Sequence, residues 1–243
     1  MRYLIKFSYD GTNYAGFQTQ KGLHTIQEEM EKALSKVNDK KTNLVATGRT
    51  DKGVHALEQY AHADIDVNIT EYKLKRALNS NLPNDIHVIE TKQVSDDFHA
   101  RYNVKSKEYR YYINLGEYNP LDRNYIFQYN YKLDIDAIKE GIKYFEGEHD
   151  FRAFVTDNKE KENCIRTITE TRAELKNDIL ELVFIGDGFL RYQVRNMVGY
   201  LIKIGEGKAK PSSVKEVIDS KDRTKSGKTA PAEGLYLYKV NYN

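Results

Sequence analysis

The stretch with the clearest chemical potential is residues 47–56, which read TGRTDKGVHA. It places one carboxylate, Asp51, between the glycines at positions 48 and 53, and it follows the apolar residues 44–46. Glycine lets the backbone approach a ligand closely, and loops at the ends of strands commonly present functional groups. A carboxylate displayed there can act as a nucleophile or as a general base.

A structural role explains the same residues equally well. Thr50 and Asp51 are both common in turns, where their side chains bind nearby backbone amides. Arg49 and Lys52 would then simply be solvated. The residue types alone therefore do not decide whether this loop is a catalytic site or an ordinary turn.

The elements around this loop predict an α+β fold. Alternating apolar residues indicate a strand at 3–9, and Thr25-Ile26-Gln27-Glu28 has the form of a capping box that starts a helix. We expect further strands at 44–46, 60–67 and from 86, and a helix at 71–79.

The second half has a similar order of elements. The turn residues Asn177-Asp178 predict a hairpin, and Gly205 is placed to cap the end of a helix. We expect strands at 107–115, 167–175, 179–185 and 235–242, and helices at 135–145 and 192–204, with a short one opened by Pro211. The sequence thus predicts two similar α/β halves around a largely antiparallel sheet, with domains at residues 1–104 and 105–243.

Bulk properties narrow the class of protein. The chain has 243 residues, 40% hydrophobic and 30% charged, and a net charge of +2, as in ordinary globular proteins. Cys164 is the only cysteine, and the six histidines show no metal-binding spacing, so we expect neither a disulfide nor a metal site. No signal peptide or membrane span is expected, because the apolar stretch 197–202 is too short, and we expect a cytoplasmic protein. His149-Asp150 is interpreted as a surface loop.

Several passages together resemble one family. Residues 48–56 are similar to the active-site motif of TruA-type pseudouridine synthases. The other passages that resemble this family occur in the family's order and run from the first strand to the last: 9–18, 81–83, 97–101, 109–111, 189–199 and 229–235.

The resemblance implies a pseudouridine synthase fold and an isomerase activity. Enzymes of this family convert uridine to pseudouridine at positions 38 to 40 of the tRNA anticodon stem-loop. They use no cofactor or metal and act as homodimers on tRNA. We therefore expect residues 1–104 to carry the catalytic loop, and residues 105–243 to complete the active-site cleft and carry a basic RNA surface.

The resemblance also implies roles for individual residues. Asp51 matches the catalytic aspartate, and Arg195 matches the arginine that pairs with it. Tyr109 matches the tyrosine that stacks on the target base. Arg49 matches the side chain that fills the space left by the flipped base, and Leu235 matches an apolar residue of the pocket. Whether Asp51 attacks the sugar or removes a ribose proton stays open.

Each role has a simpler alternative in the residues themselves. Tyr109 falls on an apolar strand face and could be a core residue, and Leu235 could be strand packing. Arg195 lies on a predicted helix, where arginine usually faces solvent. Gln193 stands where many family members have methionine, which raises the hypothesis of a shifted choice of uridine.

Charge is unevenly distributed along the chain. Residues 191–228 contain ten Lys or Arg and four acidic residues, a net charge of +6, so the remainder of the chain carries −4. Such a segment suits contact with phosphates, although a solvated lysine-rich face would look the same. Two other functions stay open: an RNA-binding protein without catalysis, and a hydrolase such as a glycosidase, which would need a second carboxylate.

Overall fold

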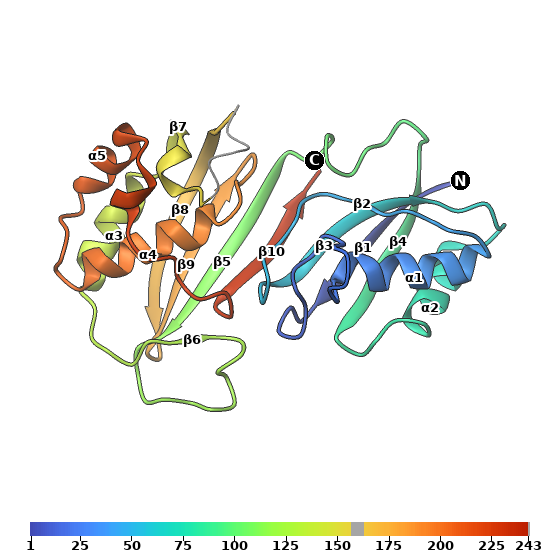
Figure 1. The fold of residues 1–243 in the computed structure, drawn as a ribbon, viewed down its shortest axis with the longest axis horizontal. Coiled ribbons are helices and arrows are strands. Elements are labelled where there is room, and N and C mark those ends of the chain that lie inside the picture. The colour runs from blue at the N-terminus through green and yellow to red at the C-terminus, as the bar shows by residue number, and fades with distance from the viewer. Residues whose placement is uncertain (157–162, 243) are drawn as a thin grey trace. The chain divides into compact units, whose positions relative to one another are not determined.

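The computed structural model describes residues 1–156 and 163–242. The chain forms two compact units (Figure 1). The first contains Met1–Lys105 and Leu237–Asn243, and the second contains Ser106–Tyr236. Each is described by itself below.

The first unit is built on strand β1 (Arg2–Tyr9). It pairs antiparallel with β3 (His55–Asp64) on one side and with β4 (Ile86–Val94) on the other. The strand order in this unit is β4-β1-β3-β10, where β10 spans Leu235–Asn241, and the short β2 (Val45–Ala46) pairs with β3. Tyr3, Ile5, Phe7 and Tyr9 are buried, which confirms the apolar face predicted for the first strand.

Two helices pack in this unit. Helix α1 (Ile26–Asn38) begins at the predicted cap, where the Thr25 side chain accepts a hydrogen bond from the Glu28 amide. Helix α2 (Glu71–Asn79) has the predicted bounds and packs along β4, and the two helices contact each other. Ile26, Met30, Ala33 and Leu34 of α1 are buried, as their 3.6-residue spacing predicts, whereas Val37 of the same face is only half-buried.

The second unit also combines a mainly antiparallel sheet with helices, but its elements do not follow one another in the similar order that the sequence predicts. Its strands are hydrogen-bonded in the order β5-β9-β8-β7, each pair antiparallel, and β6 pairs parallel with β5. The turn between β8 and β9 has positive φ at Asn177 (48°) and Asp178 (63°), the geometry that favours these residues in two-residue hairpins. The strands are β5 (Ser106–Asn114), β6 (Phe127–Gln128), β7 (Gly147–Asp150), β8 (Ile165–Lys176) and β9 (Ile179–Gly186).

The helices of the second unit gather near one another in Figure 1. Helix α3 packs on both β8 and α4, and the 3-10 helices η1 and η2 contact α4 and α5. The bounds are α3 (Ile135–Lys143), η1 (Phe151–Phe154), α4 (Gln193–Gly205), α5 (Ser213–Ser220) and η2 (Arg223–Ser226). The expected α+β class with mostly antiparallel strands is confirmed.

Three local predictions were wrong. Strand β3 begins at His55, directly after the candidate catalytic loop, and not at residue 60. Gly205 is the last residue of α4 and does not cap it. A Cβ at this position would come within 2.7 Å of Ile138 Cδ1, so glycine allows the close packing of α4 on α3. The glycine with left-handed backbone is Gly207. His149 and Asp150 belong to β7, where Asp150 caps η1. Within the described residues, no helix is long and apolar enough to cross a membrane.

Candidate active site

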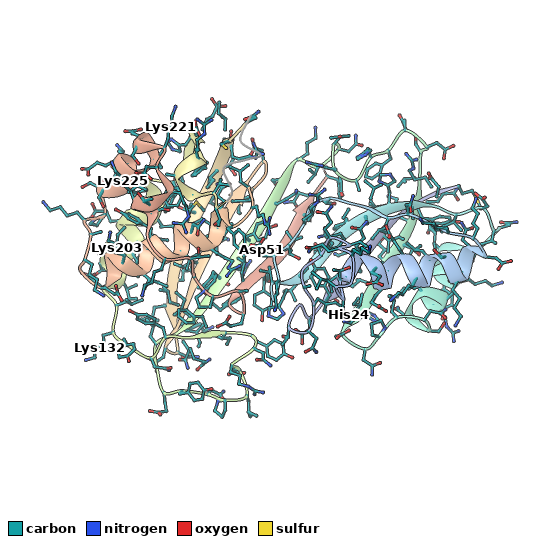
Figure 2. The ribbon with its side chains drawn as sticks, viewed as in Figure 1. His24, Asp51, Lys132, Lys203, Lys221 and Lys225 are labelled. Carbon is teal, nitrogen blue, oxygen red and sulfur yellow. The ribbon has the colours of Figure 1, made fainter. Side chains whose placement is uncertain are left out.

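Asp51 lies in the loop that connects β2 to β3, and its side chain is partly exposed (Figure 2). The loop turns back on itself through a hydrogen bond from the Val54 amide to the Asp51 carbonyl oxygen, 3.2 Å long. Gly53 has φ of 78°, a conformation that other residues adopt only at a cost. The turn therefore presents Asp51 at its edge, directly before β3 begins.

Two glycines from the passage at 9–18 hold the backbone of this loop. A Cβ on Gly11 would lie 2.1 Å from the Val54 carbonyl oxygen, so no larger residue fits there. Gly16 has φ of 105°, and a Cβ there would lie 3.1 to 3.4 Å from backbone atoms of Thr50, Asp51 and Lys52. The passage at 9–18 thus lies directly on the loop that carries Asp51.

Side chains from β1 and β3 add buried hydrogen bonds to the same loop. The Tyr9 hydroxyl lies 2.8 Å from Thr50 Oγ1, and the Phe17 amide donates to the Thr50 carbonyl at 3.1 Å. Gln59, fully buried on β3, donates from Nε2 to the Gly48 carbonyl at 3.0 Å. The sequence does not predict that Tyr9 and Gln59 support this loop. For Tyr9, the one sequence feature that points to such a role is its place at the start of the passage 9–18, which resembles the family.

His55 is a structural part of this loop. It is buried, and its Nδ1 accepts a hydrogen bond from the Gly11 amide at 3.1 Å. Asp10 Oδ1 lies 3.2 Å from the same nitrogen, so both residues of the Asp10-Gly11 turn contact this ring.

The second unit holds Arg195 near the start of α4. Its Nε donates to the Ala230 carbonyl at 2.8 Å, and the Ala230 amide donates back to the Arg195 carbonyl at 3.0 Å. Its guanidinium lies over the Tyr192 ring, 5.1 Å from the centroid. The interpretation of Arg195 as a solvated helix residue is thus wrong.

The same segment, 228–230, packs on two further residues of α4. A Cβ on Gly199 would fall 1.8 Å from the Lys228 carbonyl oxygen, so the helix and the segment touch through backbone. Asn196 is fully buried, and its Oδ1 accepts from Thr229 Oγ1 at 2.6 Å and from Arg223 Nη2 at 2.9 Å. The passages 189–199 and 229–235 therefore form one packed structure.

Tyr109 and Leu235 are both buried in the second unit. Tyr109 is 7% exposed on β5, and its ring meets that of Phe189 edge-on, with centroids 5.0 Å apart. Leu235 is 4% exposed, and its amide donates to the Ala232 carbonyl at 2.9 Å. Burial fits the packing alternative for both residues and does not test the roles implied by the family. Arg49 is exposed.

Comparison with known proteins decides the family. A family model described as tRNA pseudouridine synthase matches residues 5–103 and 142–243. The chain belongs to this family. It is a pseudouridine synthase, an isomerase, as the sequence predicts.

Full-length relatives agree with this assignment. The chain is 44% identical over 243 residues to the tRNA pseudouridine synthase A of Pseudothermotoga lettingae, covering 99% of each chain. It is 44% identical over 240 residues to that of a Thermoanaerobacter species, covering 98% of each. The structure titled as a Cbf5-Nop10-Gar1 complex matches with a TM-score of 0.36 and 11% identity, over 83% of this chain and 54% of that one. That likeness is too weak to carry a conclusion.

The matched ranges include four of the five predicted site residues of this pseudouridine synthase. Asp51 and Arg49 lie in the first range, and Arg195 and Leu235 lie in the second. Tyr109 lies between the two ranges, so its assignment depends on the resemblance of 109–111 alone. Among the residues described, no cluster of three or more His, Cys, Asp or Glu side chains could hold a metal ion.

Gln193 has a structural role in this pseudouridine synthase. It is fully buried, and its Oε1 accepts a hydrogen bond from the Leu190 amide at 2.8 Å. Its Nε2 lies 4.0 Å from the Met197 sulfur. These contacts fix the turn before α4 and give the polar side chain a structural role, while the hypothesis of a shifted choice of uridine stays a prediction.

The passage at 97–101 is held by a neutral histidine. His62 Nδ1 accepts from the Ala100 amide at 3.1 Å, and the Tyr242 hydroxyl donates to the Ala100 carbonyl at 2.8 Å. Burial, followed by the positive charge of Arg2, lowers the pKa of His62 from 6.5 to about 4.

This shift predicts a pH-dependent stability. Between pH 6.5 and about 4, unfolded His62 takes up a proton that the folded protein does not bind, so stability falls as the pH falls through that window. We expect His62→Gln, whose amide oxygen can still accept from Ala100, to flatten this part of the curve. Thermal unfolding at pH 7, 6, 5 and 4.5 measures it. Parallel curves for the variant and the wild type would contradict the role of His62.

Proposed function

We propose that this chain isomerises uridine to pseudouridine at positions 38 to 40 of the tRNA anticodon stem-loop, in the cytoplasm and as a homodimer. The observation that carries the proposal is 44% identity over nearly the whole chain to enzymes named tRNA pseudouridine synthase A, with Asp51 in its loop. The buried hydrogen bonds around that loop support a fixed direction for the carboxylate.

The reaction makes a definite demand on Asp51. The bond between N1 and C1′ breaks, the base turns, a bond forms between C5 and C1′, and the hydrogen on C5 leaves as a proton. A carboxylate can assist by covalent attack on the sugar or by removal of a ribose proton, and both require it to be ionised. Asp51 is partly exposed, so a sugar can reach it.

The other proposed roles follow the family residue by residue. Arg195 supplies the counter-charge that keeps Asp51 ionised, because a guanidinium can bind a carboxylate through two parallel hydrogen bonds. Tyr109 stacks on the extruded base, which offsets the few kcal/mol that unstacking costs. Arg49 fills the gap that the base leaves, and Leu235 lines the pocket.

Release of tritium from tRNA labelled at uridine C5 tests the activity directly. Isomerisation expels the hydrogen on C5, whereas an RNA-binding protein or a hydrolase acting on sugar or phosphate leaves it in place. We expect release from a tRNA with uridine at 38, 39 and 40, and none when all three are cytidine. Release from the cytidine tRNA would overturn the proposed positions, and no release from either would overturn the activity. Sedimentation at micromolar concentration tests the homodimer.

We further propose that part of the basic stretch 191–228 contacts tRNA phosphates. Figure 2 labels three of its lysines on the helical part of the second unit: Lys203 of α4, Lys221 after α5 and Lys225 of η2. Lys208 and Lys221 form ion pairs with Glu206 and Asp150, at 2.9 and 3.5 Å.

Arg223 does not belong to this surface. Its terminal nitrogens donate to Asn196, Ser226, Gly227 and Thr229, and burial lowers its pKa. It therefore holds the segment 226–229 in place. The exposed lysines at 210, 225 and 228 are better candidates for phosphate contact.

Replacing Lys210, Lys225 and Lys228 by alanine is expected to weaken tRNA binding roughly tenfold at 0.1 M salt. The slope of log affinity against log salt should become shallower by about two, since each phosphate contact releases counterions. The matched control is alanine at Lys36, Lys41 and Lys73, exposed lysines of the first unit, which changes net charge equally. Equal effects of the two triple variants would show a non-specific charge effect and contradict the proposed surface.

A further inference from the structure

The phenol of Tyr9 is a buried polar group that the proposed chemistry does not use. It is 4% exposed at the end of β1, and its ring centroid lies 6.1 Å from that of Phe7 and 6.3 Å from that of Phe17. Its hydroxyl lies 2.8 Å from Thr50 Oγ1, a contact that joins residues 41 positions apart, and Gln59 is a second side-chain partner. Burying a hydroxyl is costly unless it is bonded, so the contact with Thr50 fixes both partners.

Thr50 is the residue directly before Asp51 and is held from three sides. Its side chain binds Tyr9, its carbonyl accepts from the Phe17 amide at 3.1 Å, and Gly16 packs on its carbonyl oxygen. The two backbone contacts come from the same passage that Tyr9 begins. Only the Tyr9 contact acts through a side chain, so it alone can be removed without changing the backbone.

We propose that Tyr9 is a positioning residue for pseudouridine formation: its hydroxyl fixes Thr50, and through Thr50 it sets the direction in which the Asp51 carboxylate leaves the loop. Tyr9 itself touches no substrate. The inference depends on the proposed catalytic role of Asp51. Displacement of a reacting group by about 1 Å can cost roughly a hundredfold in rate, so one hydrogen bond at this place has a large effect.

The chain offers a matched control on the same strand face. Tyr3 is 1% exposed on β1, and its hydroxyl donates to the Ile69 carbonyl at 2.6 Å. Tyr3→Phe removes a phenolic hydrogen bond as Tyr9→Phe does, but a part-buried one at the end of the strand away from the loop. Comparing the two variants therefore separates a loss of protein stability from a loss of the position of Asp51.

The experiment measures single-turnover tritium release and the tRNA dissociation constant for Tyr9→Phe, Tyr3→Phe, Thr50→Val, Thr50→Ser and Asp51→Asn. We expect Tyr9→Phe and Thr50→Val to lower the rate about tenfold or more, with tRNA affinity within about twofold of wild type. Thr50→Ser, which keeps the oxygen, should stay within about threefold. The double variant Tyr9→Phe/Thr50→Val should be no slower than Tyr9→Phe alone, because Tyr9→Phe already removes the bond that Thr50→Val removes.

Three outcomes would overturn the inference: a Tyr9→Phe rate equal to that of Tyr3→Phe, a loss confined to tRNA affinity, or failure of Thr50→Ser to restore what Thr50→Val loses. An active Asp51→Asn variant would instead overturn the catalytic proposal. The two failures are thus distinct.

Discussion

Asp51→Asn is expected to abolish pseudouridine formation, lowering the single-turnover rate by about three orders of magnitude or more. The amide has nearly the same shape as the carboxylate but is neither a nucleophile nor a base, and removal of such a group costs this much in other enzymes. Binding of tRNA should change little, because phosphate contacts elsewhere supply most of the affinity. Single-turnover tritium release and a filter-binding isotherm measure the two quantities.

The control for this variant is Asp39→Asn. Asp39 is an exposed aspartate of the same unit, with φ of 50° at the end of α1, where asparagine is equally suited. It makes the same chemical change away from the loop and should leave the rate as it is. Near-native turnover of Asp51→Asn would show that Asp51 is an ordinary turn residue, which is the structural alternative given in the sequence analysis.

Arg195→Ala is expected to lower the single-turnover rate by about 10²–10³-fold, the usual cost of losing one preorganised electrostatic contact. Arg195→Lys should lose at least about tenfold, since lysine keeps the charge but not the planar pair of donors. Both variants should bind tRNA with nearly wild-type affinity. The rates and dissociation constants are measured as for Asp51.

Arg195 also supports the fold through Ala230, so its variants need a structural control. Losing that hydrogen bond costs about 1 kcal/mol of stability. Arg223→Lys disturbs the same segment through Asn196 and Thr229, and it should lower the melting temperature at least as much with a much smaller loss of rate. If Arg195→Ala loses no more rate than Arg223→Lys, Arg195 is a structural residue and Asp51 has another partner.

The elements around the site were largely predictable because their patterns are local. The face of β1 follows from strict alternation, α1 from Thr25 and its apolar spacing, and the β8–β9 hairpin from Asn177-Asp178. The start of β3 at His55 was missed because His55 is polar, yet it is buried by its bond to Gly11. The pattern of neighbouring residues does not show that a polar side chain has a hydrogen-bond partner far along the chain.

The residues that hold the Asp51 loop in place were harder to predict from the sequence, because their partners also lie far along the chain. Gly11 and Gly16 could be read as turn glycines, but both are required by backbone contacts with residues 50–54, far along the chain. Arg223 was counted as a surface charge, although four hydrogen bonds hold it within the protein. Residue types identify Asp51 as a candidate, whereas only the fold shows which residues hold its loop.

Strand β10 has a consequence for any attempt to isolate the first unit. Residues 237–242 belong to that unit, where β10 lies beside β3 and Tyr242 meets Thr47, 195 positions earlier, at the start of the Asp51 loop. A fragment that stops at Lys105 therefore lacks the strand that covers this edge of β3. An uncovered strand edge offers unpaired backbone groups to other chains. We expect such a fragment to aggregate and to hold the Asp51 loop less firmly than the whole chain does.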